Sequence, residues 1–333
     1  MRRRPASKRN SVVMIRAAIV GLGRWGRNLV EASSGRFAIV RAVEPDMARA
    51  RDFCARHGLE LTDSLDAALA DPGIGAVLLA TPHSLHPAQV LACADAQKQV
   101  FCEKPLALSR ADAARMFAAC RQAAVVLAVG HNRRFWPSMA ALRGIVASGE
   151  LGTILHIEGH NSNENSNSVS AGWRLSPQES PGGGLTGAGL HVLDAFVGLL
   201  GPIREVYARL NSHYTGPPPL DTALLALEFA CGATGTLATV RATPPYWRLH
   251  VFGTQGSAET LDEVTMILRK SGAKPERITY PAIDVLRAEL HAFADAIESN
   301  IPFPVPAADV LATLAAFEAA LRSMRSGAPE EVR

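Results

Sequence analysis

The fold is decided by the stretch Ala17–Asn28, which reads A-A-I-V-G-L-G-R-W-G-R-N. An apolar run leads into Gly21, Gly23 and Gly26 in G-x-G-x-x-G spacing, and residues with helical character follow. Gly21 permits a tight strand-to-helix turn, Gly23 lets a pyrophosphate approach the backbone, and Gly26 lets the helix lie close to the strand. The free N–H groups at the helix N-terminus then face the phosphates. The stretch therefore predicts a strand, a dinucleotide-binding turn and a helix.

The second apolar run of the chain ends at Glu44, 23 positions after Gly21. This is close to the spacing of about 20 residues expected of a carboxylate that binds a cofactor ribose. Such a carboxylate accepts hydrogen bonds from two ribose hydroxyls and repels a 2′-phosphate, so NAD is expected in preference to NADP. We also expect Arg24 and Trp25 to contact the cofactor. Because Arg24 or Arg49 could bind a phosphate, NADP remains the less favoured alternative.

Composition indicates two globular domains and a basic tail. The chain has 333 residues, of which 48% are hydrophobic and 20% charged, so it can bury sizeable cores. The formal net charge is +3, but the first ten residues hold five basic residues and no acid, which leaves 29 basic against 31 acidic residues. We therefore predict a disordered basic tail over residues 1–13 and no nucleic-acid surface on the folded body. Cleavage of a signal peptide would destroy the glycine turn, so none is predicted.

The chain is expected to be a cytoplasmic protein without a membrane partner. No run approaches the roughly 18 apolar residues that a membrane span needs. The cysteines are odd in number, scattered and without C-x-x-C spacing: Cys54, Cys93, Cys102, Cys120 and Cys231. They are predicted to be reduced thiols, mostly in the core, and no metal site is expected.

Strand and helix patterns alternate through the first 130 residues, which predicts βαβ units and a doubly wound parallel sheet of the Rossmann type over 14–130. A second, α+β domain with an open, mostly antiparallel sheet is predicted over 131–326. Its final helix, 307–326, could pack back on the first domain. The expected strands after residue 200 are Arg204–Leu210, Ala223–Phe229, Thr234–Val240, Arg248–Phe252, Ala258–Leu261 and Val264–Leu268.

Further motifs follow the glycine turn, and together they indicate a family. They are A-T-P-H-S-L-H at Ala80–His86, F-C-E-K-P-L-A at Phe101–Ala107, G-H-N-R-R-F at Gly130–Phe135 and G-G-G-L-T-G-A-G-L-H-V-L-D at Gly182–Asp194. From about Ile15 to Arg322 the chain resembles the glucose–fructose oxidoreductase / inositol dehydrogenase / MocA family of nicotinamide-dependent oxidoreductases. The spacing of E-K-P after A-T-P is the specific part of this resemblance.

The resemblance implies two catalytic residues. Lys104 of E-K-P would bind the substrate hydroxyl beside the nicotinamide and stabilise the negative charge that forms on its oxygen. His191 would relay the substrate proton. The family pattern is D-x-x-x-H, and this chain has Gly187 at the aspartate position, so one substrate-binding carboxylate is absent. Asp194, one turn beyond His191, is expected to hold the helix in place.

The remaining site residues are expected around the cofactor and the substrate. The resemblance places Thr81, Pro82, His86 and Glu103 along the nicotinamide and its ribose, and Trp173 and Arg174 toward the substrate. Asn161–Ser168 is low-complexity and polar, and we interpret it as a solvated loop; the alternative is a lid that binds substrate hydroxyls. His156 and His160 share a strand face without an acid to complete a metal site.

The resemblance implies an NAD-dependent dehydrogenase that acts on a secondary alcohol of a sugar, an inositol or a similar cyclic polyol. Two alternatives remain open: oxidation of a cyclic dihydrodiol or reduction of a ketone on the same scaffold, and a non-catalytic NAD-binding sensor or scaffold protein. A homodimer or homotetramer is expected through the open sheet of the second domain.

Overall fold

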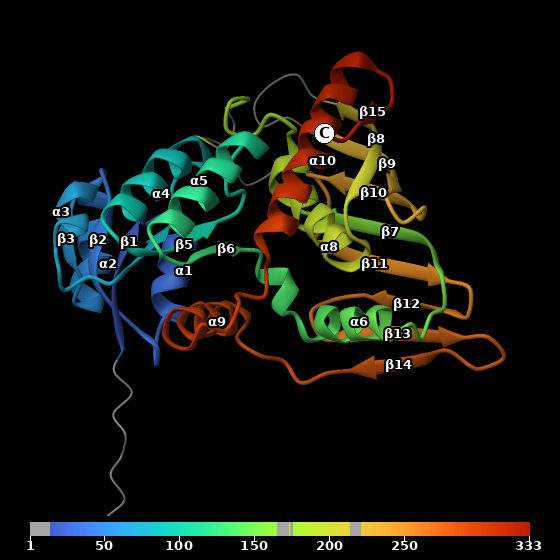
Figure 1. The fold of residues 1–333 in the computed structure, drawn as a ribbon, viewed down its shortest axis with the longest axis horizontal. Helices are drawn as coiled ribbons and strands as arrows, with labels where there is room; N and C mark the ends of the chain where they lie inside the picture. Colours follow the sequence, from blue (N-terminus) through green and yellow to red (C-terminus); the bar gives the residue numbers. More distant parts are fainter. Residues whose placement is uncertain (1–13, 165–172, 174–175, 214–220) are drawn as a thin grey trace, which may run out of the picture.

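The computed structural model describes residues 14–164, 173, 176–213 and 221–333. The predicted tail over residues 1–13, Arg174 and positions 165–168 of the Asn-rich segment lie outside the described residues. Two sheets lie side by side, one in the N-terminal part and one in the C-terminal part of the chain (Figure 1). The predicted fold class, a parallel Rossmann sheet with a second domain built on a mostly antiparallel sheet, is confirmed.

The first sheet has six parallel strands in the order β3-β2-β1-β4-β5-β6. The strands are β1 (Ile15–Val20), β2 (Phe37–Val43), β3 (Glu60–Thr62), β4 (Ala76–Leu79), β5 (Gln99–Glu103) and β6 (Leu127–Gly130). The helices that connect them are α1 (Arg24–Ala32), α2 (Met47–His57), α3 (Leu65–Leu69), α4 (His86–Asp95) and α5 (Arg110–Gln122), with a 3₁₀ turn η1 (His83–Leu85) before α4. The strand order reverses between β1 and β4, which is where such sheets bind their ligands.

Continuous apolar runs explain why these strands lie at the centre of the sheet. All four residues of β4 are inaccessible to solvent, as are Ala17, Ala18 and Ile19 of β1, which is the pattern of strands covered by helices on both faces. Short polar side chains cap several helices: Ser64, for example, accepts a hydrogen bond from the backbone N–H of Ala67 at the start of α3.

The second sheet has nine strands among the described residues, in the order β14-β13-β12-β11-β7-β10-β9-β8-β15. They are β7 (Ile154–Ser162), β8 (Ile203–Ser212), β9 (Asp221–Phe229), β10 (Thr234–Val240), β11 (Tyr246–Gly253), β12 (Gly256–Thr260), β13 (Thr265–Lys270), β14 (Glu276–Thr279) and β15 (Glu330–Glu331). The pairing is antiparallel except between β7 and β10. The prediction missed β14, which is charged, and β15, which has only two residues.

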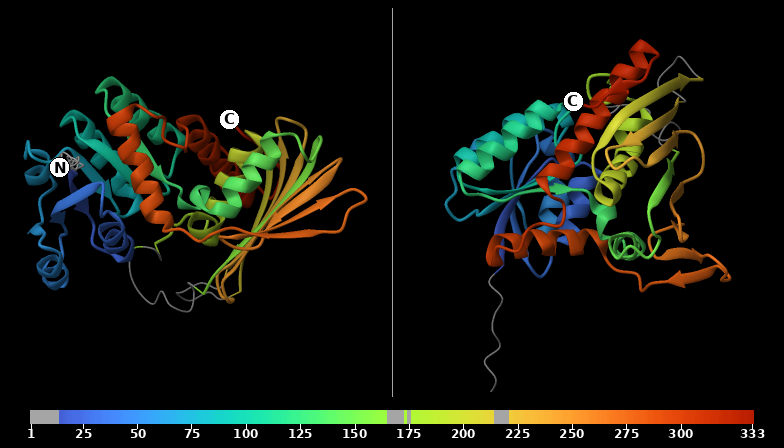
Figure 2. Two further views of the ribbon diagram at one scale, coloured as in Figure 1. Left: turned by 90° about the horizontal axis from the view of Figure 1, so that it is seen from below. Right: turned by 45° about the vertical axis from the view of Figure 1, so that its right-hand side comes forward.

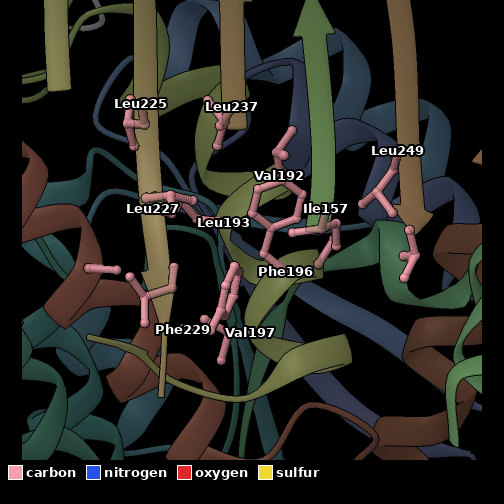
Figure 3. Close-up of a cluster of buried hydrophobic side chains, with 14 of the residues drawn as sticks. Ile157, Val192, Leu193, Phe196, Val197, Leu225, Leu227, Phe229, Leu237 and Leu249 are labelled. Atoms are coloured by element: carbon pink, nitrogen blue, oxygen red, sulfur yellow. The ribbon is translucent and has the colours of Figure 1, made fainter. Parts of the chain in front are cut away.

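Helices cover one face of this second sheet and leave the other face open (Figure 2). These helices are α6 (Pro137–Ala147), α8 (Leu190–Leu200) and α10 (Ala307–Ser326); a 3₁₀ turn η2 (Asn132–Phe135) precedes α6, and a π-helical turn η4 (Leu185–Gly189) runs into α8. Val192, Phe196 and Val197 of α8 pack on strand residues such as Ile157 and Leu237 (Figure 3).

The last two helices connect the two parts of the molecule. The helix α9 (Val285–Ser299) packs on the first sheet, where the ring of Phe293 stacks on Phe37 at 5.5 Å and lies 5.9 Å from Phe101. The range 131–326 predicted for the second domain therefore includes a helix, α9, that packs into the core of the first domain. The helix α10 contacts α5 as well as α8 and β8.

The cysteines are unpaired, as expected: the thiols of Cys54, Cys93, Cys102 and Cys120 are buried and that of Cys231 is exposed. Among the helices that the structure describes, none combines the length and the apolar character needed to cross a membrane.

Candidate active site

The glycine turn has the geometry that the sequence predicts. Gly21 has a φ of +87°, and a Cβ there would lie 2.8 Å from the carbonyl oxygen of Ala80. A Cβ on Gly26 would lie 1.9 Å from the oxygen of Gly21, so only glycine allows this approach of α1 to the turn. A Cβ on Gly23 would meet no atom of the described residues within 4 Å, and Gly23 caps α1 without a side-chain hydrogen bond. The first N–H groups of α1 are therefore available to a phosphate.

Glu44 lies directly beside this turn. Its carboxylate accepts hydrogen bonds from the backbone N–H of Leu22 at 2.7 Å and of Asp46 at 3.2 Å. Arg24 and Trp25 are the first two residues of α1. The guanidinium carbon of Arg24 lies 5.6 Å from the centre of the Trp25 ring. The turn and Glu44 thus form one continuous cradle at the carboxyl ends of β1 and β2.

The loops after β4 and β5 are joined by His86. This side chain is fully buried, and its ring nitrogens lie 2.9 Å from the carbonyl oxygen of Pro105 and 3.2 Å from that of Thr81. Burial lowers the pKa of His86. The hydroxyl of Thr81 bonds to Gln89 at 2.6 Å, and Pro82 follows in the same loop. These bonds fix the two loops relative to each other; contact of Thr81, Pro82 and His86 with a cofactor stays a prediction.

Lys104 reaches from the first domain to the second. It follows β5, and its ammonium donates a hydrogen bond to the carbonyl oxygen of Gly187 at 2.8 Å. The carboxylate of the preceding residue, Glu103, is buried against Gly130 of β6 and lies 3.3 Å from the backbone N–H of Lys104. The E-K-P motif therefore places a cation at the carboxyl edge of the Rossmann sheet, facing the start of α8.

His191 lies one helical turn after Gly187. Its side chain is 9% exposed, and its Nδ1 has no hydrogen-bond partner among the described residues. The pKa of His191 is well below its ordinary value, first because of burial and then because of the positive charges of Lys104 and Arg133. The imidazole is therefore neutral at neutral pH and can accept a proton. Lys104, 87 positions earlier in the chain, thus binds the turn that precedes His191.

Asp194 anchors the helix, as predicted. The guanidinium of Arg134 donates to both of its carboxylate oxygens, at 2.8 and 2.7 Å, and to Asp309 of α10 at 2.6 Å. Burial opposes the charge of Arg134, but Asp194 and Asp309 outweigh this effect and raise its pKa. His131 lies 3.4 Å from Asp194, and its pKa is lowered to about 4, chiefly by burial. This network fixes α8 beneath the site.

The adjacent Arg133 was not predicted as a site residue. Its guanidinium carbon lies 4.5 and 4.3 Å from the ring centres of Trp136 and Trp247, which pack edge-on against each other at 5.2 Å. One terminal nitrogen lies 3.4 Å from the Oδ1 of Asn161, and the other has no hydrogen-bond partner in the described part of the chain. Burial lowers the pKa of Arg133 to about 10, so it remains a cation at neutral pH.

The Asn-rich segment is partly strand, so the prediction of a loop over 161–168 is wrong at its start. Asn161 and Ser162 are the last residues of β7 and are buried, because the strand continues beside β11. The amide nitrogen of Asn161 donates to the carbonyl oxygen of Ala188 at 2.8 Å. Asn161 therefore links Arg133 to the turn that carries Gly187.

Trp173 lies beside the A-T-P loop, where its ring meets that of His83 edge-on at 4.8 Å. Ser84 of the same loop is bound by the carboxylate of Glu179. His156 and His160, by contrast, lie on the open face of the sheet, where they bond to the hydroxyls of Thr234 and Ser162. The described residues contain no group of three or more metal-ligating side chains.

Comparison with known proteins decides the family. Residues 15–131 match the model of an oxidoreductase family with an NAD-binding Rossmann fold, and residues 139–259 match the GFO/IDH/MocA C-terminal domain. The chain belongs to the GFO/IDH/MocA family. It is an oxidoreductase with an NAD-binding domain, and the predicted resemblance is confirmed.

Similar proteins extend over most of the chain. One is the NAD⁺-dependent scyllo-inositol 2-dehydrogenase of Bacillus subtilis, with 31% identity over 73% of this chain and 72% of the relative. Another is the myo-inositol 2-dehydrogenase of Thermotoga maritima, with 29% identity over 96% and 99%. Among solved structures, a protein of gentamicin A biosynthesis in complex with NAD aligns with a TM-score of 0.85 and 26% identity, covering 100% of this chain and 99% of that one.

The residues present fit the cofactor of the family. The turn at Gly21 and Gly23 leaves room for a pyrophosphate, the start of α1 offers uncapped N–H groups, and Glu44 lies where a ribose would be bound. Glu103 and Lys104 lie at the same sheet edge, where the nicotinamide end would reach. The described residues on the cofactor side of this GFO/IDH/MocA chain are thus compatible with NAD.

Proposed function

We propose that this protein is an NAD-dependent dehydrogenase that oxidises a secondary alcohol of a sugar, an inositol or a similar cyclic polyol. The observation that carries this proposal is the hydrogen bond of Lys104 to Gly187, which holds an ammonium group beside the neutral imidazole of His191. The pair lies at the sheet edge to which the glycine turn leads. The inositol dehydrogenases among the relatives support the substrate class.

In the proposed mechanism, Lys104 acts on the oxygen of the substrate hydroxyl group and His191 acts on its proton. The Lys104 ammonium donates a hydrogen bond to the substrate oxygen and stabilises the negative charge that develops there. His191 accepts the hydroxyl proton through a ring nitrogen, which its neutral state allows. The cofactor, held by the glycine turn and Glu44, would supply the hydride acceptor for the carbon that bears this hydroxyl group. Glu103 holds the backbone of Lys104, while Asp194 and Arg134 hold the helix that carries His191.

Replacing the lysine tests this assignment. We expect Lys104→Met to reduce kcat for polyol oxidation by at least 10³-fold, because it removes the charge that stabilises the developing oxyanion. Affinity for NADH, measured by calorimetry, is expected to change less than threefold. Lys274→Met serves as the matched control, since Lys274 is exposed between β13 and β14.

Turnover retained in Lys104→Met would refute the assignment of this lysine. Tight NADH binding without turnover of any sugar, inositol or dihydrodiol by the unmodified protein would instead favour the non-catalytic NAD-binding alternative. Assays in both directions are required, because the same two side chains can return the proton during reduction of a ketone.

We also propose that the protein forms a homodimer or homotetramer through the open face of the second sheet. Leu224 is 54% exposed on this face, where small residues of β9 and β10 lie beside it. Two cations and two carboxylates alternate across the neighbouring strands: Arg248 binds Glu158 and Glu259, and Arg269 binds Glu259. Because positive and negative side chains alternate on this face in equal numbers, the same face of a second copy can pair each charge with an opposite one.

We place the protein in the cytoplasm. The unpaired, buried thiols support this proposal, because reduced core cysteines are typical of a reducing compartment.

A further inference from the structure

Two of the glycines that precede η4 are packed against one carboxylate, that of Asp221. A Cβ on Gly183 would lie 2.8 Å from its Oδ2, and a Cβ on Gly184 would lie 2.7 Å from its Oδ1. Gly183 also has a φ of +53°. Asp221 is the first residue of β9, and its side chain is buried, with 2% of the residue exposed. The carboxylate thus occupies the space that side chains at 183 and 184 would need.

The Asp221 carboxylate binds the start of the turn η4. The backbone N–H of Gly184 donates a hydrogen bond to its Oδ1 at 3.0 Å. Gly184 is the residue directly before η4, and η4 runs without a break into α8. The first N–H groups of a helical segment lack partners within the segment, and an acidic side chain is a favourable acceptor for them. Asp221 therefore caps this segment from a distant strand.

Arg241 fixes the carboxylate on the side of the strands. Its Nη1 lies 3.2 Å from the Oδ2 of Asp221, and its backbone N–H donates to the carbonyl oxygen of Asp221 at 3.2 Å. Arg241 is also buried. Burial raises the pKa of Asp221, while Arg241 and the N–H of Gly184 act in the opposite direction. The ends of β9 and β10 thus determine where the carboxylate lies.

The same turn carries the contact with Lys104. Gly187 lies three residues after Gly184, and its carbonyl oxygen accepts a hydrogen bond from the Lys104 ammonium at 2.8 Å. The turn is π-helical, with the N–H of Leu190 bound to the carbonyl oxygen of Leu185. Single π-helical turns within helices are frequent at functional sites. The direction of the Gly187 carbonyl depends on where the turn begins, which is the point that Asp221 holds.

We propose that Asp221 is a positioning residue for Lys104: it binds the N–H of Gly184 and so fixes the turn whose Gly187 carbonyl orients the lysine. The inference rests on the proposed dehydrogenase function and adds to it a residue that acts through the backbone. Asp221 neither gains nor loses a proton in the reaction. Its effect is on the orientation of the ammonium toward the substrate oxygen, to which rates are sensitive.

The first test reports on Lys104 without requiring turnover. The protein is treated with trace acetic anhydride, and the acetylation rate of Lys104 is divided by that of Lys274, which is exposed. We call this quotient the Lys104 ratio. A hydrogen bond to a carbonyl oxygen stabilises the ammonium form, and only the free amine reacts. We therefore expect Asp221→Ala to raise the Lys104 ratio by about threefold or more. Asp221→Asn, whose amide oxygen can still accept from Gly184, should raise it less.

A second variant removes the hydrogen bond without leaving an unpaired charge. Asp221→Leu combined with Arg241→Met replaces a buried ion pair by apolar side chains of similar size, a change that is often neutral or favourable for stability. We expect this double variant to fold and to raise the Lys104 ratio as Asp221→Ala does. Its kcat for polyol oxidation should fall by about tenfold or more, with NADH affinity changed by less than about threefold. A role of Asp221 in stability alone would leave kcat intact in this variant.

Lys98→Met is the control for general loosening of the fold. The Lys98 ammonium is bound to the carbonyl oxygens of Asp71 and Ile74, at the end of the first sheet opposite to Lys104. We expect this variant to lose stability without a change in the Lys104 ratio. A Lys104 ratio that is unchanged in the double variant, or that rises equally in Lys98→Met, would overturn the proposal.

The outcomes also separate this inference from the function on which it rests. A Lys104 ratio that rises as expected, in a protein that oxidises no polyol, would leave Asp221 as a positioning residue and count against a dehydrogenase. Polyol oxidation that depends on Lys104 and persists undiminished in the double variant would support the dehydrogenase and overturn the role of Asp221.

Discussion

The most unusual single residue is Glu289 of α9. Its side chain is fully buried, and neither carboxylate oxygen has a hydrogen-bond partner among the described residues. Burial raises the pKa of Glu289 well above its ordinary value, and the charges of Glu103 and Asp194 add to this effect. Glu289 is therefore protonated in the folded protein at pH values at which it ionises in the unfolded chain.

This difference predicts a pH dependence of stability. A pKa that is raised by folding means that the folded state binds the proton more tightly. Proton binding by Glu289 therefore stabilises the folded state. This contribution is fully present below the pKa of about 4.3 in the unfolded chain and is lost as the pH rises toward the pKa in the folded protein. Within that window we expect the free energy of unfolding to fall by about 1.4 kcal/mol per pH unit from this group. Glu289→Gln should remove this contribution, as chemical denaturation at a series of pH values would show.

The control for that experiment is Glu31→Gln, because Glu31 is exposed on α1. It should leave the pH profile of stability unchanged. An unaltered profile in Glu289→Gln would show that Glu289 is ionised in the folded protein.

Residue-level prediction succeeded where a local pattern fixes the role. The glycine spacing and Glu44 need only the strand–turn–helix unit around them, and the structure brings them together. Arg133 was not predicted, since one of the two rings that it contacts is Trp247, more than 100 residues later in the chain. Glu289 was missed for the same reason: a glutamate on an amphipathic helix is ordinarily solvated, and only the packing of α9 buries it.

At the scale of elements, the contact of α8 with β7 depends on Gly159. A Cβ on Gly159 would lie 2.2 Å from a methyl carbon of Val192 and 2.8 Å from the ring of Phe196. We expect Gly159→Ala to destabilise the protein by about 1–3 kcal/mol, because a packed interface must move to admit a methyl group. Thermal or chemical denaturation measures the effect.

The matched control is Gly144→Ala in the exposed part of α6, where a Cβ meets no atom of the described part of the chain within 4 Å. Since alanine favours a helix interior, this variant should stabilise the protein by about 0.5–1 kcal/mol. Adding Val192→Ala to Gly159→Ala should cost less than the two single changes together, because the removed methyl relieves the clash. Additive losses would argue against a direct contact of α8 with position 159.

Element prediction was accurate where periodicity is strong. The alternating pattern over 223–229 predicted β9 within two residues of its start. The hydrophobic periodicity of an element does not indicate in which of the two domain cores it packs. The helix α9 shows an apolar stripe that suits either sheet, and its packing on Phe37 and Phe101 is decided only by the folded arrangement.

At the scale of the whole molecule, the site is formed by two domains that are tied together in several places. Lys104 binds Gly187, Ser84 binds Glu179, and α10 packs against both parts. Sequence analysis could identify Lys104 and His191 only through the family resemblance, because no local pattern brings residues 87 positions apart to one space.

The open face of the second sheet gives the last prediction, which concerns assembly. If two copies join through this face, a charge in its apolar part must be desolvated in the interface. We therefore expect the unmodified protein to sediment as a multiple of its 35.4 kDa chain, and Leu224→Glu to shift it toward the monomer by at least tenfold in dissociation constant. Ile301→Glu is the control, since Ile301 is equally exposed, at 55%, but lies in the loop between α9 and α10. An assembly that survives Leu224→Glu and is lost in Ile301→Glu would assign the contact to the helical side, and a monomeric unmodified protein would refute the open face as an interface.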